Sequence, residues 1–305
     1  PPGGALRPLV NRASALAVGR VVWPYRFDLT RMTDASVVVA HNRPWDARAI
    51  REAFPHARAV LHLHNRVMRW VPPWAKRRAL RDFDAIICVS DFIRRDLLAR
   101  VKDPGLAART HVAHNGVEGI AVPRTTQDID VLYVGRIVPE KGVHTLALAL
   151  GNVPGPLTVT FVGGHGFLPD DHPTDYEKRV HRLVAKTHKT AVFTGPISPS
   201  EVWNYRARAK VTVVPSEWEE PCSLAVLEAL ASGSALIATT TGGTPELVGD
   251  GSAILVSPNA PRELAAAITD LLANDDRRAD CAASGSDRGR QLSWTRTFET
   301  IERAV

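Results

Sequence analysis

Cysteine and long apolar runs are scarce in this sequence. The chain has 305 residues but only 3 cysteines, Cys88, Cys222 and Cys281, too few for a disulfide scaffold and without metal-site spacing. No uninterrupted apolar run reaches about 18 residues, which excludes a transmembrane helix of the usual kind. The chain opens without methionine and without a charged-then-apolar signal segment. These absences favour a protein of a reducing, cytoplasmic compartment.

The composition is that of a folded protein with two domains. Hydrophobic residues make up 45% of the chain and charged residues 23%, so the chain is too apolar to be disordered. A length of 305 residues is about twice that of a typical domain. We therefore expect two separate hydrophobic cores.

The charge is unevenly distributed around a formal net charge of +6. Residues 1–125 hold 21 Lys and Arg against 10 Asp and Glu, a net charge of +11. Residues 126–305 hold the remaining 17 cations and 22 acids, a net charge of −5. The basic half predicts an anionic partner, and nucleic acid, an anionic membrane and a phosphorylated acceptor all fit that charge.

The densest basic stretch, 66–81, combines six cations with Trp70 and Trp74. Tryptophan beside Lys and Arg suits the membrane–water interface, where the ring is half-buried and the cations meet lipid phosphates. This predicts peripheral contact with the inner face of a membrane. The alternative is a solvated helix start whose two tryptophans pack inward.

Short apolar runs alternate with helical stretches, the pattern of parallel α/β sheets. The strands expected in the first half are 35–40, 59–64, 85–90 and 110–114. The helices expected between them are 44–54, 74–82 and 91–101. The opening Pro-Pro-Gly-Gly is typical of a loop, so we expect that the first strand of this domain is missing from the chain.

Residues 119–128 have the composition of a linker. After them the alternation of apolar runs and helical stretches begins again, with more strands and helices than in the first half. The strands expected in the second half are 130–134, 157–162, 191–194, 211–214, 235–238 and 253–256. The helices expected there are 142–150, 174–188, 199–208, 223–231, 244–248, 261–273 and a final amphipathic one at 294–305. We expect a first domain over 1–122 and a second over 123–292. Ligands of such sheets bind beyond the carboxyl ends of the strands.

The first motif that carries chemistry is 134–142, which follows a strand and precedes a helix. Gly135 permits a sharp turn, and Arg136 and Lys141 place two cations at the end of the strand. Lys141 also lies near a helix N-terminus, where the peptide dipoles favour an anion. The motif predicts a metal-free diphosphate site, with an ordinary turn carrying surface charges as the alternative.

The second motif, 215–230, also follows an apolar strand. Ser223 is the expected N-cap of a helix that opens at Leu224, and Glu220 precedes that helix. Glu228 lies within the helix, eight residues from Glu220, a span of at most roughly 12 Å at helical rise. One carboxylate can then hold ribose hydroxyls while the other holds a sugar. The helix dipole explains an acid at the position of Glu220 but not at that of Glu228.

Three weaker features leave alternatives open. Gly242-Gly243 follows a strand and fits either a tight turn or close contact with a ligand. His62 and His64 share one face of a strand, but the sequence shows no third ligand nearby, so no metal is expected. A histidine there either hydrogen-bonds a sugar hydroxyl or phosphate or is a structural residue under a loop. Gly3-Gly4 is suited to cradling a phosphate.

Together these residues resemble the retaining glycosyltransferases of family 4, which have the GT-B fold. The last of the strong segments contains Glu220 and Glu228 at the spacing of the family's Glu-x7-Glu motif. The strong segments are 134–142, 192–199 and 211–255. The first half matches more weakly, at 64–65, 87–90 and 114–117.

The resemblance implies two Rossmann-like doubly wound domains that face each other across a cleft, with helix 293–305 packing back on the first. It implies a nucleotide-diphosphate sugar as donor, a UDP-sugar before others, and no cofactor. Arg136 and Lys141 would hold the diphosphate, and Glu228 the ribose hydroxyls. Glu220 and the N–H groups of Cys222, Ser223 and Leu224 would bind the donor sugar. Gly195 and Ile197 would contact the base, and Gly135, Gly3 and Gly4 would lie near the phosphates. His64 would contact the sugar or the acceptor.

The family usually has an aromatic residue and a glycine where this chain has Cys222 and Ser223, which bears on the choice of sugar. We expect a retaining hexosyltransferase with a hydroxyl acceptor, anionic or lipid-linked, in the synthesis of envelope polysaccharide, glycolipid or a secondary-metabolite glycoside. The pair Asp128 and Asp130 matches the metal-binding Asp-x-Asp of other glycosyltransferases but precedes a strand, so we interpret it as structural.

Two other classes compete with this interpretation. An epimerase of nucleotide sugars or a phosphorylase shares the fold, although the sequence shows no signature of the pyridoxal-binding lysine of a phosphorylase. A nucleic-acid-binding module would fit the basic half, but no zinc finger, aromatic sheet signature or isolated basic helix supports it. We therefore expect no nucleic-acid partner.

Overall fold

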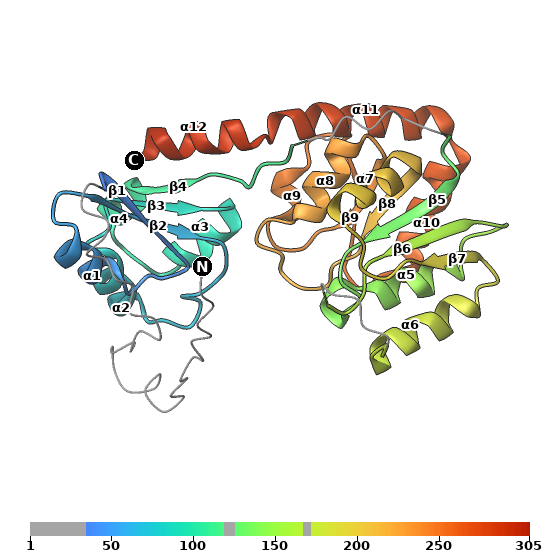
Figure 1. The fold of residues 1–305 in the computed structure, drawn as a ribbon, viewed down its shortest axis with the longest axis horizontal. Helices are drawn as coiled ribbons and strands as arrows, with labels where there is room; N and C mark the ends of the chain where they lie inside the picture. Colours follow the sequence, from blue (N-terminus) through green and yellow to red (C-terminus); the bar gives the residue numbers. More distant parts are fainter. Residues whose placement is uncertain (1–34, 119–125, 167–171) are drawn as a thin grey trace, which may run out of the picture.

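The computed structural model describes residues 35–118, 126–166 and 172–305. Two parallel β-sheets with flanking helices form two α/β domains side by side, which confirms the expected fold class (Figure 1). The expected absence of an opening strand concerns residues before 35 and lies outside the described residues, as does the expected boundary at 122/123.

The first sheet has the order β1-β2-β3-β4, and all its neighbouring strands are parallel. All residues of the interior strand β3 are buried, as expected where helices or other elements cover both faces. The strands are β1 (Val37–His41), β2 (Arg58–Leu63), β3 (Ala85–Cys88) and β4 (Thr110–Val112). The helices are α1 (Ala47–Ala53), α2 (Pro73–Leu80), α3 (Asp91–Leu98) and the short α4 (Pro104–Ala108), which the sequence did not predict.

Within the described residues, the second sheet has six parallel strands in the order β10-β9-β8-β5-β6-β7. Its strands are β5 (Ile129–Val134), β6 (Thr158–Val162), β7 (Thr190–Phe193), β8 (Ala209–Val214), β9 (Ala235–Thr239) and β10 (Ile254–Val256). Its helical elements are η2 (Pro139–Lys141), α5 (Val143–Leu150), α6 (Asp175–Ala185), α7 (Pro199–Arg208), α8 (Leu224–Ser232), α9 (Thr244–Leu247) and α10 (Pro261–Ala273).

The strand order of the second sheet reverses direction at β5. From β5 the chain moves outward through β6 to β7, and it then returns to β8 on the other side of β5. Ligands of open α/β sheets bind at such a switch point, beyond the carboxyl ends of the two strands. The segments that follow β5 and β8 are the two motifs that carry Lys141 and Glu220.

Helix α11 (Asp275–Gln291) was not predicted from the sequence. Its 17 residues are rich in charged and small side chains, so they show no apolar stripe. The buried side of the helix is formed instead by small residues, which allow α11 to pack closely along α8 and β9. At Gly289 an added Cβ would lie 2.9 Å from the backbone nitrogen of Ala231. The buried residues are Cys281, Ala282, Gly285 and Gly289.

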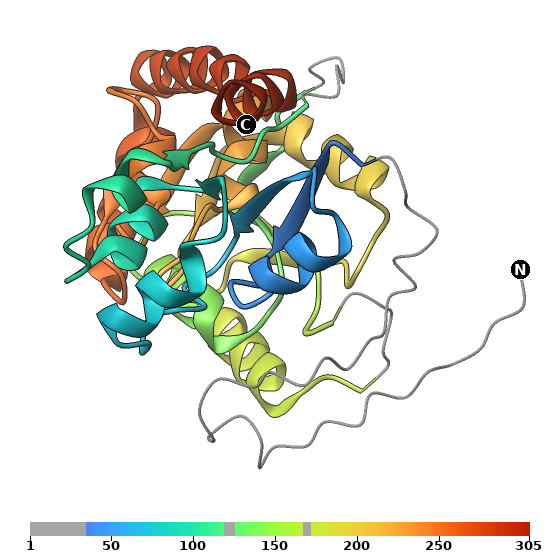
Figure 2. The same ribbon diagram turned by 90° about the vertical axis from the view of Figure 1, so that its left-hand side faces the viewer.

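Helix α12 (Trp294–Ala304) follows α11 and lies against the first domain (Figures 1 and 2). Ile301, Ala304 and Val305 pack on a buried cluster of the first sheet that includes Val60 and Ile87. The hydroxyl of Thr297 donates a 2.8 Å hydrogen bond to the carbonyl oxygen of His114. The chain therefore crosses from the first domain to the second and returns at its C-terminal end. No helix within the described ranges combines the length and hydrophobicity needed to span a membrane.

Candidate active site

The motifs after β5 and β8 meet at the switch point. The amide of Glu217 donates a 2.9 Å hydrogen bond to the carbonyl oxygen of Glu140, which ties the two loops together. Gly142 has a φ of +65°, and an added Cβ would lie 1.9 Å from the carbonyl oxygen of Pro215. Only glycine fits this position, because a side chain would push the two loops apart.

Lys141 and Glu220 form an ion pair across this junction. The side chains are 22% and 7% exposed, so the carboxylate is nearly buried and the ammonium group is partly open to solvent. Ser216 donates a 2.9 Å hydrogen bond from its hydroxyl to the same carboxylate, and the Lys141 nitrogen lies 5.6 Å from the centre of the Trp218 ring. The sequence predicted these two charged residues for one ligand, and the fold brings them into contact.

Gly242 and Gly243 lie against the backbone of Glu220. The amide of Gly243 donates a 2.7 Å hydrogen bond to the carbonyl oxygen of Glu220. At Gly242, with a φ of +55°, an added Cβ would lie 2.1 Å from that oxygen. The structure therefore shows the tight turn at this glycine pair, and its contact with a ligand stays a prediction.

Gly135, Arg136 and Ile197 line one pocket of about 250 Å³ beyond the end of β5. The hydroxyl of Tyr133 fixes the turn by donating a 2.6 Å hydrogen bond to the carbonyl oxygen of Arg136. The loop at 195–198 lines this pocket with Pro196 and Ile197. The carbonyl oxygen of Gly195 accepts a 3.0 Å hydrogen bond from the amide of Gly163, another residue of the pocket wall. The fold thus places the residues expected at the phosphates next to those expected at the base.

A second pocket, of about 180 Å³, adjoins the first and shares Gly163 and Gly164 with it. Its wall contains Glu177, whose carboxylate accepts hydrogen bonds from the amides of Thr174 and His165 at 2.8 Å each. Burial raises the pKa of Glu177, but these hydrogen bonds outweigh it and hold the pKa below its ordinary value. Sequence reasoning missed this carboxylate, whose only local signal was the capping box that starts α6 with Thr174.

The N-terminus of α8 opens beside Glu220. Ser223 occupies the N-cap position as predicted, but its side chain accepts no hydrogen bond from the helix amides. Leu224 is 50% exposed, whereas Cys222 is buried. Burial raises the pKa of the Cys222 thiol to about 12, and the backbone of Asn115, in the first domain, hydrogen-bonds to it. The thiol is therefore a neutral packing group.

Glu228 lies one turn inside α8, where the buried Arg206 of α7 holds it. One Arg206 nitrogen donates a 2.7 Å hydrogen bond to Glu228, and the two side chains are 1% and 38% exposed. Burial lowers the pKa of Arg206, and the charge of Glu228 opposes this shift. Sequence reasoning missed Arg206, although its spacing from the buried Trp203 places it on the inward face of α7.

The Asp-x-Asp pair, which we interpreted from the sequence as structural, forms ion pairs within the fold. Asp128 binds Arg208, and Asp130 pairs with Lys210 at 2.7 Å. Asp130 also accepts a 2.8 Å hydrogen bond from the amide of Thr158. This agrees with the interpretation of the Asp-x-Asp sequence as part of the fold.

Glu246 joins the two domains, and the sequence assigned it no role. Its carboxylate accepts hydrogen bonds from the amides of Asp91 at 2.6 Å and Phe92 at 2.7 Å, at the start of α3. His114 lies 3.2 Å from the same carboxylate. Burial raises the pKa of Glu246, but the hydrogen bonds from His114 and the two amides lower it below its ordinary value.

In the first domain, His64 lies directly after the end of β2, close to two other histidines. His41, the last residue of β1, pairs with His62 in the parallel register, and its Nδ1 lies 2.9 Å from Nε2 of His64. Burial lowers the pKa of His62 to about 4, with further lowering by the two neighbouring imidazoles. The expectation that no third histidine lies near His62 and His64 was wrong, because it overlooked the strand pairing. Gly3 and Gly4 lie outside the described residues.

The basic segment 66–81 exposes both tryptophans, Trp70 by 86% and Trp74 by 62%. The alternative in which these rings pack inward is therefore wrong. Arg69 lies 3.3 Å from the carboxylate of Glu219, and Arg81 lies 3.4 Å from that of Asp82. Two further cations of the segment also have partners within the protein. Arg66 binds Asp96 and Glu219, and the buried Lys76 donates 3.0 Å hydrogen bonds to the carbonyl oxygens of Asp96 and Leu97.

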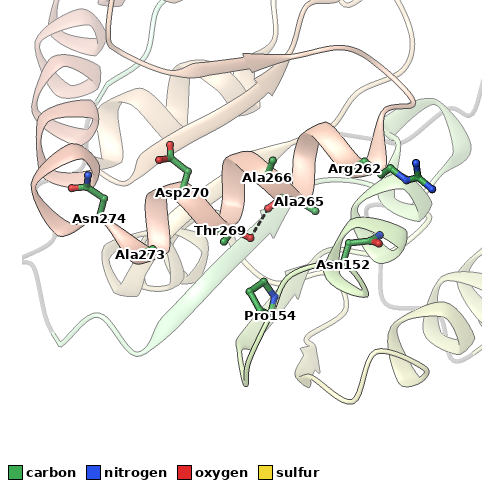
Figure 3. Close-up of a pocket in the computed structure, with 9 residues that line it drawn as sticks. All are labelled: Asn152, Pro154, Arg262, Ala265, Ala266, Thr269, Asp270, Ala273 and Asn274. Carbon is green, nitrogen blue, oxygen red and sulfur yellow. Dashed lines mark hydrogen bonds between the residues drawn. The ribbon is translucent and has the colours of Figure 1, made fainter.

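A larger open pocket of about 540 Å³ lies against α10, and it contains none of the motif residues (Figure 3). Small side chains such as Ala265, Ala266 and Ala273 make up much of its wall. Thr269 uses its hydroxyl within the helix, donating a 2.8 Å hydrogen bond to the carbonyl oxygen of Ala265. Because the motif residues lie elsewhere, the candidate active site is at the switch point and not in this pocket.

Two family models cover most of the chain. Residues 121–288 match the family described as glycosyl transferases group 1, and residues 4–118 match glycosyltransferase family 4. The chain is 26% identical over 312 residues to spore coat protein SA of Bacillus subtilis, covering 93% of this chain and 80% of that protein. It is 28% identical over 310 residues to the lipopolysaccharide 1,2-N-acetylglucosaminetransferase of Salmonella typhimurium, covering 96% and 78%.

Solved structures show the same architecture. Anabaena Alr3699/HepE in complex with UDP matches with a TM-score of 0.77 at 21% identity, covering 90% of this chain and 79% of that one. Its complex with UDP-glucose matches with a TM-score of 0.70, covering 90% and 80%. This likeness confirms the expected GT-B fold. The chain therefore belongs to the family of glycosyl transferases group 1 and is a glycosyltransferase whose first domain is of the family 4 type.

Proposed function

We propose that this protein transfers a hexose from a nucleotide-diphosphate sugar to a hydroxyl acceptor with retention at the anomeric carbon. The observation that carries the proposal is the meeting of Lys141 and Glu220 beside the Arg136 pocket, at the switch point of the second sheet. Cations there match a diphosphate, and a nearly buried carboxylate beside them matches sugar hydroxyls.

In this proposal the donor lies along the ends of β5 and β8. Arg136 and Lys141 bind the diphosphate, and Glu228, oriented by Arg206, binds the ribose hydroxyls. Glu220 and the open N-terminus of α8 bind the donor sugar. The base lies against Gly195 and Ile197. The UDP and UDP-glucose named in the similar HepE structures make uridine the first nucleotide to test.

The proposed reaction breaks the bond between the anomeric carbon and the β-phosphate oxygen and forms a bond from that carbon to the acceptor oxygen. Arg136 and Lys141 stabilise the negative charge that grows on the leaving diphosphate. The acceptor approaches from the same face, and a β-phosphate oxygen takes its proton. This route uses neither a metal ion nor a covalent enzyme intermediate.

For the acceptor, we propose an anionic or lipid-linked molecule of envelope polysaccharide or glycolipid synthesis. The net charge of +11 over residues 1–125 supports this, as does the lipopolysaccharide enzyme among the similar proteins. The exposed Trp70 and Trp74 beside Arg69, Arg77 and Arg78 support peripheral contact with an anionic membrane. Retention on vesicles with anionic lipid, and its loss in a Trp70→Ser/Trp74→Ser double variant, tests that contact.

A thermal-shift panel of UDP-, GDP-, ADP- and dTDP-sugars tests the function. A ligand at 100 times its Kd raises the free energy of unfolding of the protein by about 2.7 kcal/mol, so the true donor should give a clear shift. With the best donor, proton NMR of the product reports whether the anomeric configuration is kept. Inversion contradicts the proposed mechanism, and stabilisation by no nucleotide sugar contradicts the donor class. Conversion of the donor without acceptor to its epimer would instead reveal an epimerase.

A further inference from the structure

The pairing of β1 with β2 brings three histidines together at one edge of the first sheet. His41 and His62 are partners in the parallel register, and His64 lies on the same face as His62, just after β2 ends. The ring centres are 4.1 Å apart for His62 and His64, 5.2 Å for His41 and His64, and 5.3 Å for His41 and His62. One ring nitrogen from each residue lies within 4.8 Å of those of the other two.

The polar atoms of this cluster are incompletely satisfied. His62 is only 9% exposed, and its buried Nε2 has no hydrogen-bond partner among the described residues. Buried polar atoms are normally paired, and an exception calls for an explanation such as an ion. The other two rings share one 2.9 Å contact, between Nδ1 of His41 and Nε2 of His64.

The backbone around the cluster is held in place. Asn42 has a φ of +54°, and its side-chain oxygen accepts hydrogen bonds from the amide of His64 at 2.8 Å and that of Asn65 at 3.2 Å. The chain that follows β1 is thereby tied to the chain that follows β2. The three imidazoles are thus carried by a rigid pair of strand ends, as a ligand site requires.

We propose that His41, His62 and His64 bind a divalent transition-metal ion, for which Zn²⁺ is the best match. Three imidazoles with one open position form a common zinc coordination set. Nitrogens at 2.0–2.1 Å from a tetrahedral ion lie about 3.4 Å from one another, so small side-chain rotations close the observed spacing. Because His41 is exposed and His62 is buried, the fourth position faces solvent.

Metal binding at this site would also affect the transfer rate, an inference that rests on the proposed function. The metal engages His64, the residue that the family resemblance places at the donor sugar or the acceptor, and so removes it from the transfer reaction. Zn²⁺ is therefore expected to lower the transfer rate without weakening donor binding by the second domain. The site is thus inhibitory, and it is separate from the metal-free chemistry of Arg136 and Lys141.

The test uses the untagged full-length protein, stripped with chelator and then dialysed. Calorimetric titration with Zn²⁺ is expected to give one site per chain. Co²⁺ is expected to give the visible absorption bands of a tetrahedral complex. His41→Asn removes an exposed ligand without disturbing the core. Loss of a residue that only supports a metal ligand typically weakens metal binding by roughly 10–100-fold. Loss of the ligand His41 itself should weaken Zn²⁺ binding by more than that. His56→Asn, at an exposed histidine in the turn before β2, is the matched control and should leave binding unchanged.

Absence of a stoichiometric Zn²⁺ site in the wild type, or equal affinity in His41→Asn and wild type, overturns the metal proposal. These titrations contain no nucleotide, so they do not depend on the transferase activity. Conversely, Zn²⁺ binding in a protein that no nucleotide sugar stabilises would refute the proposed function and leave the metal site standing. If Zn²⁺ binds but the transfer rate is unchanged, the assignment of His64 to the reaction is wrong.

Discussion

The guanidinium group of Arg206, buried under α8, donates a 2.7 Å hydrogen bond to the partly exposed carboxylate of Glu228. Among the described residues, the Nε and Nη1 atoms of Arg206 have no hydrogen-bond partner, so the side chain is held in the interior largely by this one contact. A buried cation behind a carboxylate fixes the direction of that carboxylate. This arrangement suits a carboxylate that binds two neighbouring hydroxyls.

Replacing Arg206 with Met is expected to raise KM for the donor by roughly tenfold or more with a smaller change in kcat, because a hydrogen bond to a charged group contributes about 1.5–3 kcal/mol. The same variant should discriminate less between UDP and its 2′,3′-dideoxy analogue in a thermal-shift assay. Arg208→Met, in the same helix but bound to Asp128, is the control. Equal discrimination in Arg206→Met and wild type would contradict a role for Arg206 in positioning Glu228.

Replacing Arg136 with Ala is expected to lower kcat by roughly 10²-fold, by analogy with the loss of one preorganised donor to a developing charge. Steady-state kinetics with the best donor measures this effect. Arg262→Ala, on the exposed side of α10 and away from the switch point, should keep the wild-type rate. An unchanged kcat in Arg136→Ala would remove this residue from the catalytic machinery.

Excess chelator is expected to leave the transfer rate intact or to raise it, because the proposed chemistry at the diphosphate uses no metal. Rates measured with EDTA, and then with Mg²⁺ or Mn²⁺ restored, check this. Asp128→Asn/Asp130→Asn provides a second check, since both carboxylates already bind basic side chains. Abolition of activity by EDTA, with recovery on adding Mg²⁺, would refute metal independence.

Glu246→Gln is expected to destabilise the protein by about 1–3 kcal/mol at pH 7, because the carboxylate accepts two short amide hydrogen bonds from the other domain. The folded pKa lies below the ordinary value of 4.5, so the stabilisation is complete above that value. It is lost as the pH falls through the lower, folded pKa.

The measurement for this prediction is the difference in denaturant midpoint between wild type and Glu246→Gln, followed from pH 7 to pH 3. The difference should shrink as the pH falls. Glu299→Gln, an exposed residue of α12, is the control for a general charge effect. A difference that stays constant with pH would show that the Glu246 carboxylate does not link the domains electrostatically.

Gly142→Ala is expected to cost about 2 kcal/mol more than Gly155→Ala. Both glycines have positive φ, +65° and +73°, so both substitutions carry similar backbone strain. An added Cβ at Gly142 would lie 1.9 Å from a backbone oxygen, whereas at Gly155 it would meet nothing within 4 Å. Equilibrium unfolding measures the difference. Equal costs would mean that the loops after β5 and β8 separate easily.

Several features could be predicted from the sequence because they depend on neighbours in the chain. The apolar runs before Gly135 and Pro215 identified β5 and β8, and the turn residues after them identified the motifs. The apolar stripe of α8 placed Glu228 within a helix. Helix α11 escaped prediction because it packs through Cys281, Gly285 and Gly289, whose small side chains carry almost no hydrophobic signal.

The sequence alone determined the α/β class, the two units and the residue types that can bind a diphosphate and sugar hydroxyls. Only the tertiary structure decided which distant residues meet. His41 joins His62 through the register of two strands, Arg206 reaches Glu228 from another helix, and Glu246 crosses to the first domain. These contacts depend on how separate elements pack, and periodicity within one segment carries no information about the distance to a side chain in another.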